Sequence, residues 1–87
     1  MMNFNHLYYF YMTVKCAGVT AAASHLRVSQ PALSSQLKVL EGSLNVTLFR
    51  KVGRQNELTE PGLLVYGFCR RMFEVSEELL GRVIDPL

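Results

Sequence analysis

Residues 28–44 read VSQPALSSQLKVLEGSL, and this stretch decides the fold of the chain. Four leucines recur in it at spacings of four, three and four residues: Leu33, Leu37, Leu40 and Leu44. At about 100° per residue, these leucines fall within about 60° of one another around a helix axis. The pattern is typical of a helix with one buried stripe.

The opposite side of this predicted helix is small and polar. The residues that project there are Pro31, Ser34, Ser35 and Lys38, with one cation and no carboxylate among them. Short side chains let a helix approach another molecule closely. The working hypothesis is that this molecule is DNA.

The composition indicates one small, globular, cytoplasmic domain. Of the 87 residues, 49% are hydrophobic and 18% charged, which is typical of a folded chain. We expect no membrane span, because no run of about 20 apolar residues occurs. We also expect no signal peptide, because the first residues lack a basic segment and Asn3, Asn5 and His6 interrupt any apolar run. Cys16 and Cys69 stand far apart without metal-ligand spacing, so we expect two reduced thiols packed as small hydrophobes.

The charge of the chain is divided unevenly along its length. Residues 1–56 carry six cations against Glu41 alone, whereas residues 57–87 carry three arginines against six carboxylates. This asymmetry predicts that the first part faces a polyanion. Glu41 follows the leucine stripe, and we expect it either to cap a backbone group or to pair with a nearby cation.

The first predicted helix spans residues 3–17 and is apolar almost all round, so we expect it to be covered on more than one side. Asn3 or Asn5 is suited to cap its start. Its tyrosines, among them Tyr8 and Tyr9, follow a core stripe, which favours packing over stacking against single-stranded nucleic acid.

A helix-turn-helix follows. Ala17-Gly18 is predicted to end the first helix, with the glycine in the left-handed conformation. Thr20 is predicted to cap a short helix that ends at Leu26. After a tight connection Ser29 caps the helix of residues 30–44, with proline in its first turn, and Asn45 is suited to end that helix.

The helical spacing of apolar residues stops between residues 46 and 58, where we predict a β-hairpin. Leu48, Phe49 and Val52 suggest one strand, residues 53–56 a turn, and Leu58 a short return strand. The cations at the far end are Arg50, Lys51 and Arg54. Such a hairpin is either a wing that reaches the DNA backbone or minor groove, or an ordinary solvated hairpin.

A long helix is predicted from residue 59, capped by Thr59, to Ile84, before Pro86. One apolar stripe runs along it, made of Leu64, Phe68, Met72, Val75, Leu79 and Val83. The apolar face is too wide to be covered by two small helices. We therefore predict that this helix is a dimerisation element, only partly covered by its own domain.

A second pattern consists of positions spread over the whole chain. They are Leu7 and Phe10, Ala22, Ala23 and Leu26, residues 28–34, 36–38 and 40–41, Leu44, Leu48-Phe49, Gly53-Arg54, residues 58–60 and Gly62. This pattern resembles the N-terminal DNA-binding domain of LysR-type bacterial transcription regulators. Within that family, the opening NFNHLYYF of residues 3–10 is similar to the branch that activates sodium/proton antiporter genes.

The resemblance implies a mainly helical winged helix-turn-helix, with three helices and a hairpin wing, in residues 1–58. It implies that residues 59–87 form a linker helix that pairs two subunits. It further implies binding to an interrupted inverted repeat in promoter DNA, and a larger ligand-sensing domain for a small-molecule effector. That domain is not in this sequence, so we expect the chain to be a DNA-binding fragment.

Several positions depart from the family pattern. Ala17-Gly18 stands where the family usually has Gly-Ser, and Ser35 where it often has arginine. Lys51 replaces a common wing arginine, which removes a planar bidentate donor. The architecture survives these departures, but the family's DNA sequence preference does not transfer, because Ser35 lies on the reading face itself.

The expected contacts divide into base reading and phosphate binding. Gln30 is suited to a bidentate contact with adenine, and Pro31, Ser34 and Ser35 to base edges or a thymine methyl. Ser29 serves as a cap or a phosphate ligand. The cations Lys38, Arg50, Lys51 and Arg54 are expected to neutralise phosphates, with Arg54 best placed for the minor groove.

Two other classes of function were weighed against DNA binding. A helical protein-protein interaction module would use the long helix and leave the basic half without a purpose. An enzyme is not expected, because no carboxylate, cysteine or histidine stands at catalytic spacing from Glu41. We also expect no cofactor and no metal, since His6 and His25 lie on separate elements.

Overall fold

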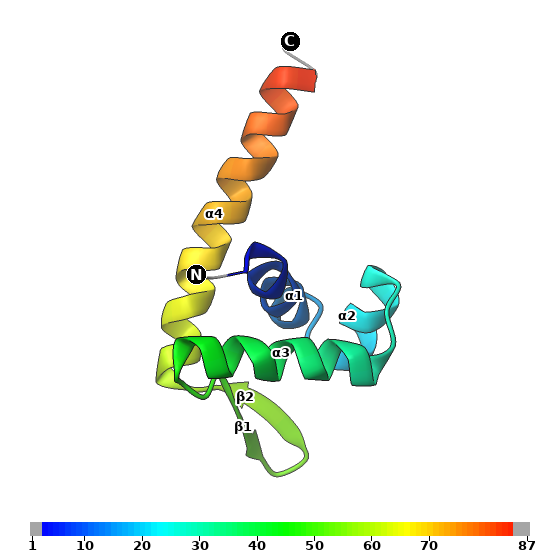
Figure 1. Cartoon of the computed structure of the whole chain (residues 1–87), viewed down its shortest axis with the longest axis vertical. Coiled ribbons are helices and arrows are strands. Elements are labelled where there is room, and N and C mark those ends of the chain that lie inside the picture. The colour runs from blue at the N-terminus through cyan, green and yellow to red at the C-terminus, as the bar shows by residue number, and fades with distance from the viewer. Residues whose placement is uncertain (1–2, 85–87) are drawn as a thin grey trace.

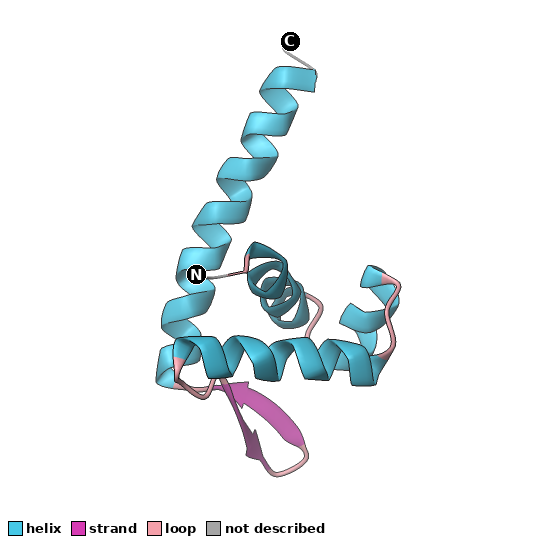
Figure 2. Cartoon of the chain, viewed as in Figure 1, coloured by secondary structure: helices cyan, strands magenta, loops and turns pink. Residues whose placement is uncertain are grey.

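A computed structural model describes residues 3–84 of the chain, which form four helices and one antiparallel hairpin (Figures 1 and 2). The helices are α1 (Phe4–Lys15), α2 (Val19–Leu26), α3 (Gln30–Leu44) and α4 (Glu60–Ile84); the strands are β1 (Phe49–Val52) and β2 (Gln55–Leu58). The predicted element order and the mainly helical winged-helix class are confirmed. Pro86, predicted to end the last helix, lies outside the described residues.

The helix α1 lies at the centre of the domain and packs against α2, α3 and α4 (Figure 1). Leu33 and Leu40 are fully buried on α3 and Leu37 nearly so, while Leu44 is half-buried at the end of the stripe. On α1 itself, Phe10 is fully buried. The leucine stripe and the covering of the first helix on several sides are therefore confirmed.

The tyrosines of α1 pack within the protein. Tyr11 is buried, with its ring 5.9 Å from Tyr66 and 5.2 Å from Phe73 between centroids. Nearby, the thiol of Cys69 donates to the carbonyl of Leu7 at 3.9 Å, and burial raises the pKa of this thiol to about 11. Both cysteines are free thiols. The aromatic and sulfur contacts join α4 to α1.

Most predicted helix ends are confirmed. Asn3 caps α1, since its Oδ1 accepts the backbone N–H of Asn5 at 2.8 Å. Ser29 caps α3 through the N–H of Ala32 at 3.1 Å, and Asn45 ends α3 in the left-handed conformation with a φ of 56°. Thr59 caps α4, because its Oγ1 accepts the N–H of Gly62 at 3.0 Å.

Two predictions at the turn between α1 and α2 are wrong. Thr20 lies inside α2, and Gly18 holds the N-cap position without a side-chain hydrogen bond. The left-handed residue that ends α1 is Ala17, with a φ of 61°, and Gly18 follows with a φ of 144°. A side chain rarely adopts the second of these conformations. The glycine is therefore needed to enter α2 rather than to leave α1.

The hairpin turn is also shorter than predicted. Leu48 precedes β1, and Gln55 and Asn56 belong to β2, so only Gly53 and Arg54 connect the strands. Gly53 takes a φ of 64° in this tight connection, a conformation that a glycine adopts without strain. The shorter turn fixes the pairing register, in which Lys51 faces Asn56 and Arg50 faces Glu57.

The helix α4 has two halves with different surroundings. Its first half packs against α1, whereas its second half projects away from the domain (Figure 1). Val75, Leu79 and Val83 are all more than half exposed there. Within residues 3–84, no helix combines the length and the apolar composition that a membrane span requires.

Gly62 lies where α4 meets the segment that leads into β1, and a methyl group does not fit there. A Cβ at this position would clash with the carbonyl oxygen of Leu48. We expect Gly62→Ala to lower the free energy of unfolding by about 1–3 kcal/mol, as overpacking does. Gly67→Ala is the matched control, because its Cβ would meet nothing within 4 Å; there a gain of about 0.5–1 kcal/mol is expected. Urea unfolding of both variants tests this, and equal effects would contradict it.

Candidate nucleic-acid interface

The outer face of α3 is exposed to solvent because the leucine stripe on the opposite face is buried in the core. Every side chain predicted to lie on it is exposed: Ser29, Gln30, Pro31, Ser34, Ser35 and Lys38. Pro31 lies in the first turn of α3, where its missing N–H costs no helix hydrogen bond. The structure thus places these predicted residues together on one accessible surface.

The hairpin, called the wing below, is anchored at its root. Phe49 and Leu58 form its innermost pair and pack against the core, and the ring of Phe49 lies 5.5 Å from that of Phe10 between centroids. Because side chains alternate along a strand, Lys51 and Asn56 share the face of this anchored pair. Arg50 and Glu57 lie opposite each other on the other face.

A cleft of about 380 Å³ separates α3 from the wing. Its chief polar lining is Ser34, Lys38, Glu41, Arg50, Lys51 and Asn56. Two predicted residues of α3 and two predicted cations of the wing therefore meet across one polar cleft. Arg54 is at the tip of the wing and lines a second cleft, beside the turn between α1 and α2.

Glu41 is the carboxylate of the α3–wing cleft, and its role is that of a cap. Its Oε2 accepts the backbone N–H of Leu48 at 2.6 Å. Of the two expectations for Glu41, capping of a backbone group is confirmed. The bond ties α3 to the residue that precedes β1.

Sequence reasoning missed three wing residues. Asn56 lines both clefts, but it was assigned to the turn; Gln55 was misassigned in the same way, and Glu57 was not recognised as the partner of Arg50 across the strands. The signal that identifies them is the pair Gly53-Arg54, because a two-residue connection centred there sets the register.

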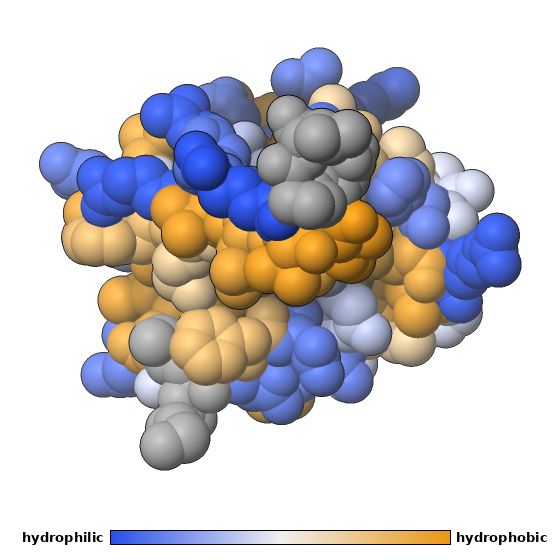
Figure 3. Space-filling model, turned by 90° about the horizontal axis from the view of Figure 1, so that it is seen from above, coloured by the Kyte–Doolittle hydropathy of each residue, from blue (hydrophilic) through white to orange (hydrophobic). Residues whose placement is uncertain are grey.

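The predicted dimerisation stripe lies mostly on the surface. Leu64, Phe68, Val75, Leu79 and Val83 are between 53% and 69% exposed, whereas Met72 is half-buried against the core of its own domain. In the view along α4 from its C-terminal end, apolar surface gathers on one side of the projecting helix and hydrophilic surface lies on another (Figure 3). The guanidinium of Arg71 lies 4.6 Å from the ring centroid of Phe68, a cation–π contact that partly covers this ring.

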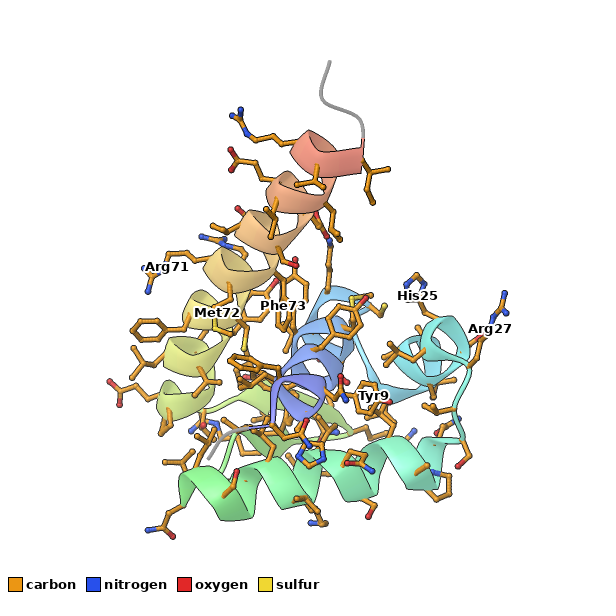
Figure 4. The ribbon with its side chains drawn as sticks, turned by 45° about the horizontal axis from the view of Figure 1, so that its top comes forward. Tyr9, His25, Arg27, Arg71, Met72 and Phe73 are labelled. Atoms are coloured by element: carbon orange, nitrogen blue, oxygen red, sulfur yellow. The ribbon has the colours of Figure 1, made fainter. Side chains whose placement is uncertain are left out.

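Figure 4 separates two ends of the molecule. Arg71 points away from the domain, while Met72 and Phe73 lie on the side of α4 that faces α1. His25 and Arg27 are exposed at the far end of α2. Among residues 3–84, no cluster of three or more histidine, cysteine or acidic side chains has the arrangement of a metal site.

Comparisons with a family model and with curated relatives all point to the same family. Residues 4–63 match the family described as bacterial regulatory helix-turn-helix protein, lysR family. The chain is 39% identical over 82 residues to the transcriptional activator protein NhaR of Escherichia coli K12, covering 94% of this chain and 27% of that protein. It is 37% identical over 84 residues to the regulator PtxR of Pseudomonas aeruginosa, covering 97% of this chain and 27% of that protein. The chain thus spans about a quarter of the length of these relatives.

Two solved DNA complexes have the same fold. The CbnR DNA-binding domain in complex with DNA is 34% identical, with a TM-score of 0.79, and the match covers 94% of both chains. The BenM DNA-binding domain with its catB site 1 DNA is 28% identical, with a TM-score of 0.85, covering 94% of this chain and 92% of that one. The chain therefore belongs to the LysR family of bacterial regulatory helix-turn-helix proteins and has the winged-helix fold of that family's DNA-binding domains.

Proposed function

We propose that this chain binds double-stranded promoter DNA sequence-specifically, as one half of a homodimer, with α3 in the major groove and the wing against the neighbouring backbone. The observation that carries the proposal is the α3–wing cleft. There the small polar face of α3 and the cations of the wing lie side by side on one exposed surface. On this surface, the short side chains of α3 would approach base edges closely while the cations neutralise phosphates.

In this proposal, the residues in the first half of α3 contact the base edges. Gln30 lies at the exposed start of the helix and has the amide that pairs with the N6 and N7 of adenine. Pro31, Ser34 and Ser35 are short enough to touch base edges or a thymine methyl. Ser29 already caps the helix with its hydroxyl, and its side chain is exposed to a phosphate as well.

Phosphate binding falls to Lys38 and the wing. Lys38 and Lys51 line the cleft from its two sides, where the backbone strand between the two grooves would pass. Arg54 at the wing tip is suited to the minor groove. Glu57 is the cross-strand neighbour of Arg50 in the strand register. We infer that its negative charge, although not ion-paired with Arg50, offsets part of the positive charge that Arg50 presents to DNA, whereas Lys51 has Asn56 as its neighbour.

The proposed dimer uses the exposed stripe of α4. The intervals from Leu64 to Val83 are four, four, three, four and four residues, a spacing that reads the same in both directions. Two antiparallel copies can therefore bring exposed stripe residues together in pairs, Leu64 with Val83 and Phe68 with Leu79. Arg71 then approaches the partner's acidic half near Glu78, whereas a parallel in-register pair would set like charges side by side.

Such a dimer would place two copies of α3 in major grooves one or more helical turns apart, on an inverted repeat. The relatives are about three and a half times as long as this chain. A small-molecule effector would accordingly act through a part of the protein outside this sequence. The site of action is the bacterial cytoplasm, where promoter DNA lies.

A helical protein-protein interaction module is the second candidate, and the exposed apolar stripe of α4 favours it. A titration against random duplex DNA at several salt concentrations separates the two candidates. Binding in the micromolar range or weaker, falling steeply with salt, supports DNA binding. No measurable binding at low salt would leave the interaction module as the better explanation.

Gln30 is predicted to read a base. Gln30→Ala should cost about 1–3 kcal/mol on the preferred site and relax base preference at one position, because the bidentate contact is lost. Binding-site selection with both proteins measures the preference. Gln36→Ala is the control, since Gln36 is half-buried and off the outer face of α3. An unchanged preference in the Gln30 variant would refute the assigned role.

The wing cations are predicted to contribute unequally. Lys51→Ala should weaken binding to all sequences and reduce the slope of log K against log salt by about 0.9, one counterion's share. Arg50→Ala should change the slope less, and Glu57→Gln should tighten binding, because Glu57 opposes Arg50. Fluorescence anisotropy at varied salt measures all three. Equal slopes for the two cation variants would show that Glu57 does not offset Arg50.

Phe68 is predicted to lie in the dimer interface. Phe68→Asp places an unpaired charge in the stripe, so we expect monomers that bind a half-site weakly. Sedimentation equilibrium gives the mass. Leu63→Asp is the matched control, because Leu63 is 60% exposed against 53% for Phe68 and lies off the stripe. Dimers that persist in the Phe68 variant would place the interface elsewhere.

A further inference from the structure

We propose that Glu41 is a positioning residue for DNA binding: it holds the wing at the distance from α3 at which Lys51 and Arg54 reach the backbone while α3 occupies the major groove. The inference rests on the proposed function. It concerns a residue that touches no DNA in that proposal and acts through the peptide group of Leu48.

The position of Glu41 needs an explanation, because it is the only carboxylate in residues 1–56. It lies in a cleft that Lys38, Arg50 and Lys51 also line. A negative charge there repels the phosphates of a DNA backbone. A carboxylate on this surface is therefore expected to serve a purpose that outweighs its repulsion.

The hydrogen bonds around Leu48 supply that purpose. The Oε2 of Glu41 accepts the N–H of Leu48 at 2.6 Å, and the carbonyl of Leu48 accepts the N–H of Thr59 at 3.0 Å. The side chain of Leu48 is fully buried. The residue that enters the wing is thus held by α3 through its N–H, and by the segment that enters α4 through its carbonyl.

The same junction is closed on its other side by α4. The hydroxyl of Thr59 donates to the carbonyl of Thr47 and accepts the N–H of Gly62. Gly62 in turn packs directly on the Leu48 carbonyl. Among the described residues, the Glu41 contact is the side-chain hydrogen bond that joins α3 to this junction. Its loss would remove this side-chain tie to α3 while leaving the ties to α4 and the packing of Phe49 against Phe10 in place.

The wing converts a small movement at its root into a larger one at its tip. Each strand has four residues, so the tip lies about 13 Å from the root at about 3.3 Å per residue. Residues 50–57 are all exposed. A rotation at Leu48 would therefore displace Lys51 and Arg54 while leaving the reading face of α3 unchanged.

Two conservative substitutions of Glu41 separate the effect of its side-chain length from the effect of its charge. Glu41→Gln keeps an acceptor oxygen at full length and removes the charge, whereas Glu41→Asp keeps the charge on a side chain one methylene shorter. Each is combined with Lys51→Ala, and duplex binding is measured by anisotropy at several salt concentrations. In each background, the loss of duplex affinity and of salt slope caused by Lys51→Ala shows whether the wing still contacts DNA.

A positioning role predicts the following. In the wild-type and Glu41→Gln backgrounds, Lys51→Ala reduces the salt slope by about 0.9. In the Glu41→Asp background the same change alters the slope by less than half as much and the affinity by less than twofold, because the wing is already displaced. The base preference at positions read by α3 stays the same in all backgrounds.

Ser43→Ala is the control for a merely structural effect. Ser43 lies near the same end of α3, and its hydroxyl donates to the carbonyl of Leu40 at 3.0 Å, away from the wing. The effect of Lys51→Ala should persist in this background. Thermal unfolding of every variant shows whether the fold is intact.

A full Lys51→Ala effect in the Glu41→Asp background would overturn the positioning role and leave Glu41 as a repulsive charge. A wild-type chain without salt-dependent duplex binding would instead overturn the proposed function.

Discussion

Leu33 and Leu40 are excluded from solvent where α3 packs against α1, and this burial orients everything that the domain presents to a partner. A helix that buries one stripe must expose the opposite one. On α3 that opposite side carries Pro31, two serines and a single lysine, with the exposed Val39 at its edge. The hydrophobic contact thus orients the surface that we assign to DNA, although no residue of the stripe would touch it.

The same centre orients the other two functional elements. Phe49 packs against Phe10 of α1 and thereby anchors the wing beside α3. Tyr66 and Phe73 pack against Tyr11 of α1, so the first half of α4 is covered and the second half projects. One aromatic and aliphatic core therefore sets both the direction of the wing and the direction of the stripe that is free for a second copy.

The sequence predicts those features that repeat with a regular period or depend on one local hydrogen bond. The leucine stripe of α3 has a period, and the caps Asn3, Ser29 and Thr59 each satisfy a nearby N–H, so all of these were predictable. The boundary at Ala17-Gly18 was not, because several neighbouring residues suit that turn; within residues 53–56 the pair Gly53-Arg54 is a turn signal, but the polar residues beside it suit a longer turn as well. Only the packing of the flanking elements selects which residue takes the positive φ.

The candidate site divides in the same way. The exposure of Gln30, Ser34 and Ser35 follows from helical geometry and was predictable. The places of Asn56 and Glu57 depend on strand register, which shifts every side chain to the other face when the turn moves by one residue. The bond from Glu41 to Leu48 joins residues seven apart across the end of a helix; sequence showed that an acceptor was available but not which N–H it would meet.

The junction at Leu48 connects the two tasks proposed for the chain. Reading DNA requires a fixed distance between α3 and the wing, and pairing two copies requires a fixed direction of α4. Leu48 is bonded to Glu41 on α3 and to Thr59 before α4, and Gly62 admits no side chain at their contact. Because the N–H of Leu48 is bonded to α3 and its carbonyl to the start of α4, a shift of either helix would act on the wing root through this residue. The spacing between two half-sites and the contact of each wing with its backbone would then depend on the same few hydrogen bonds.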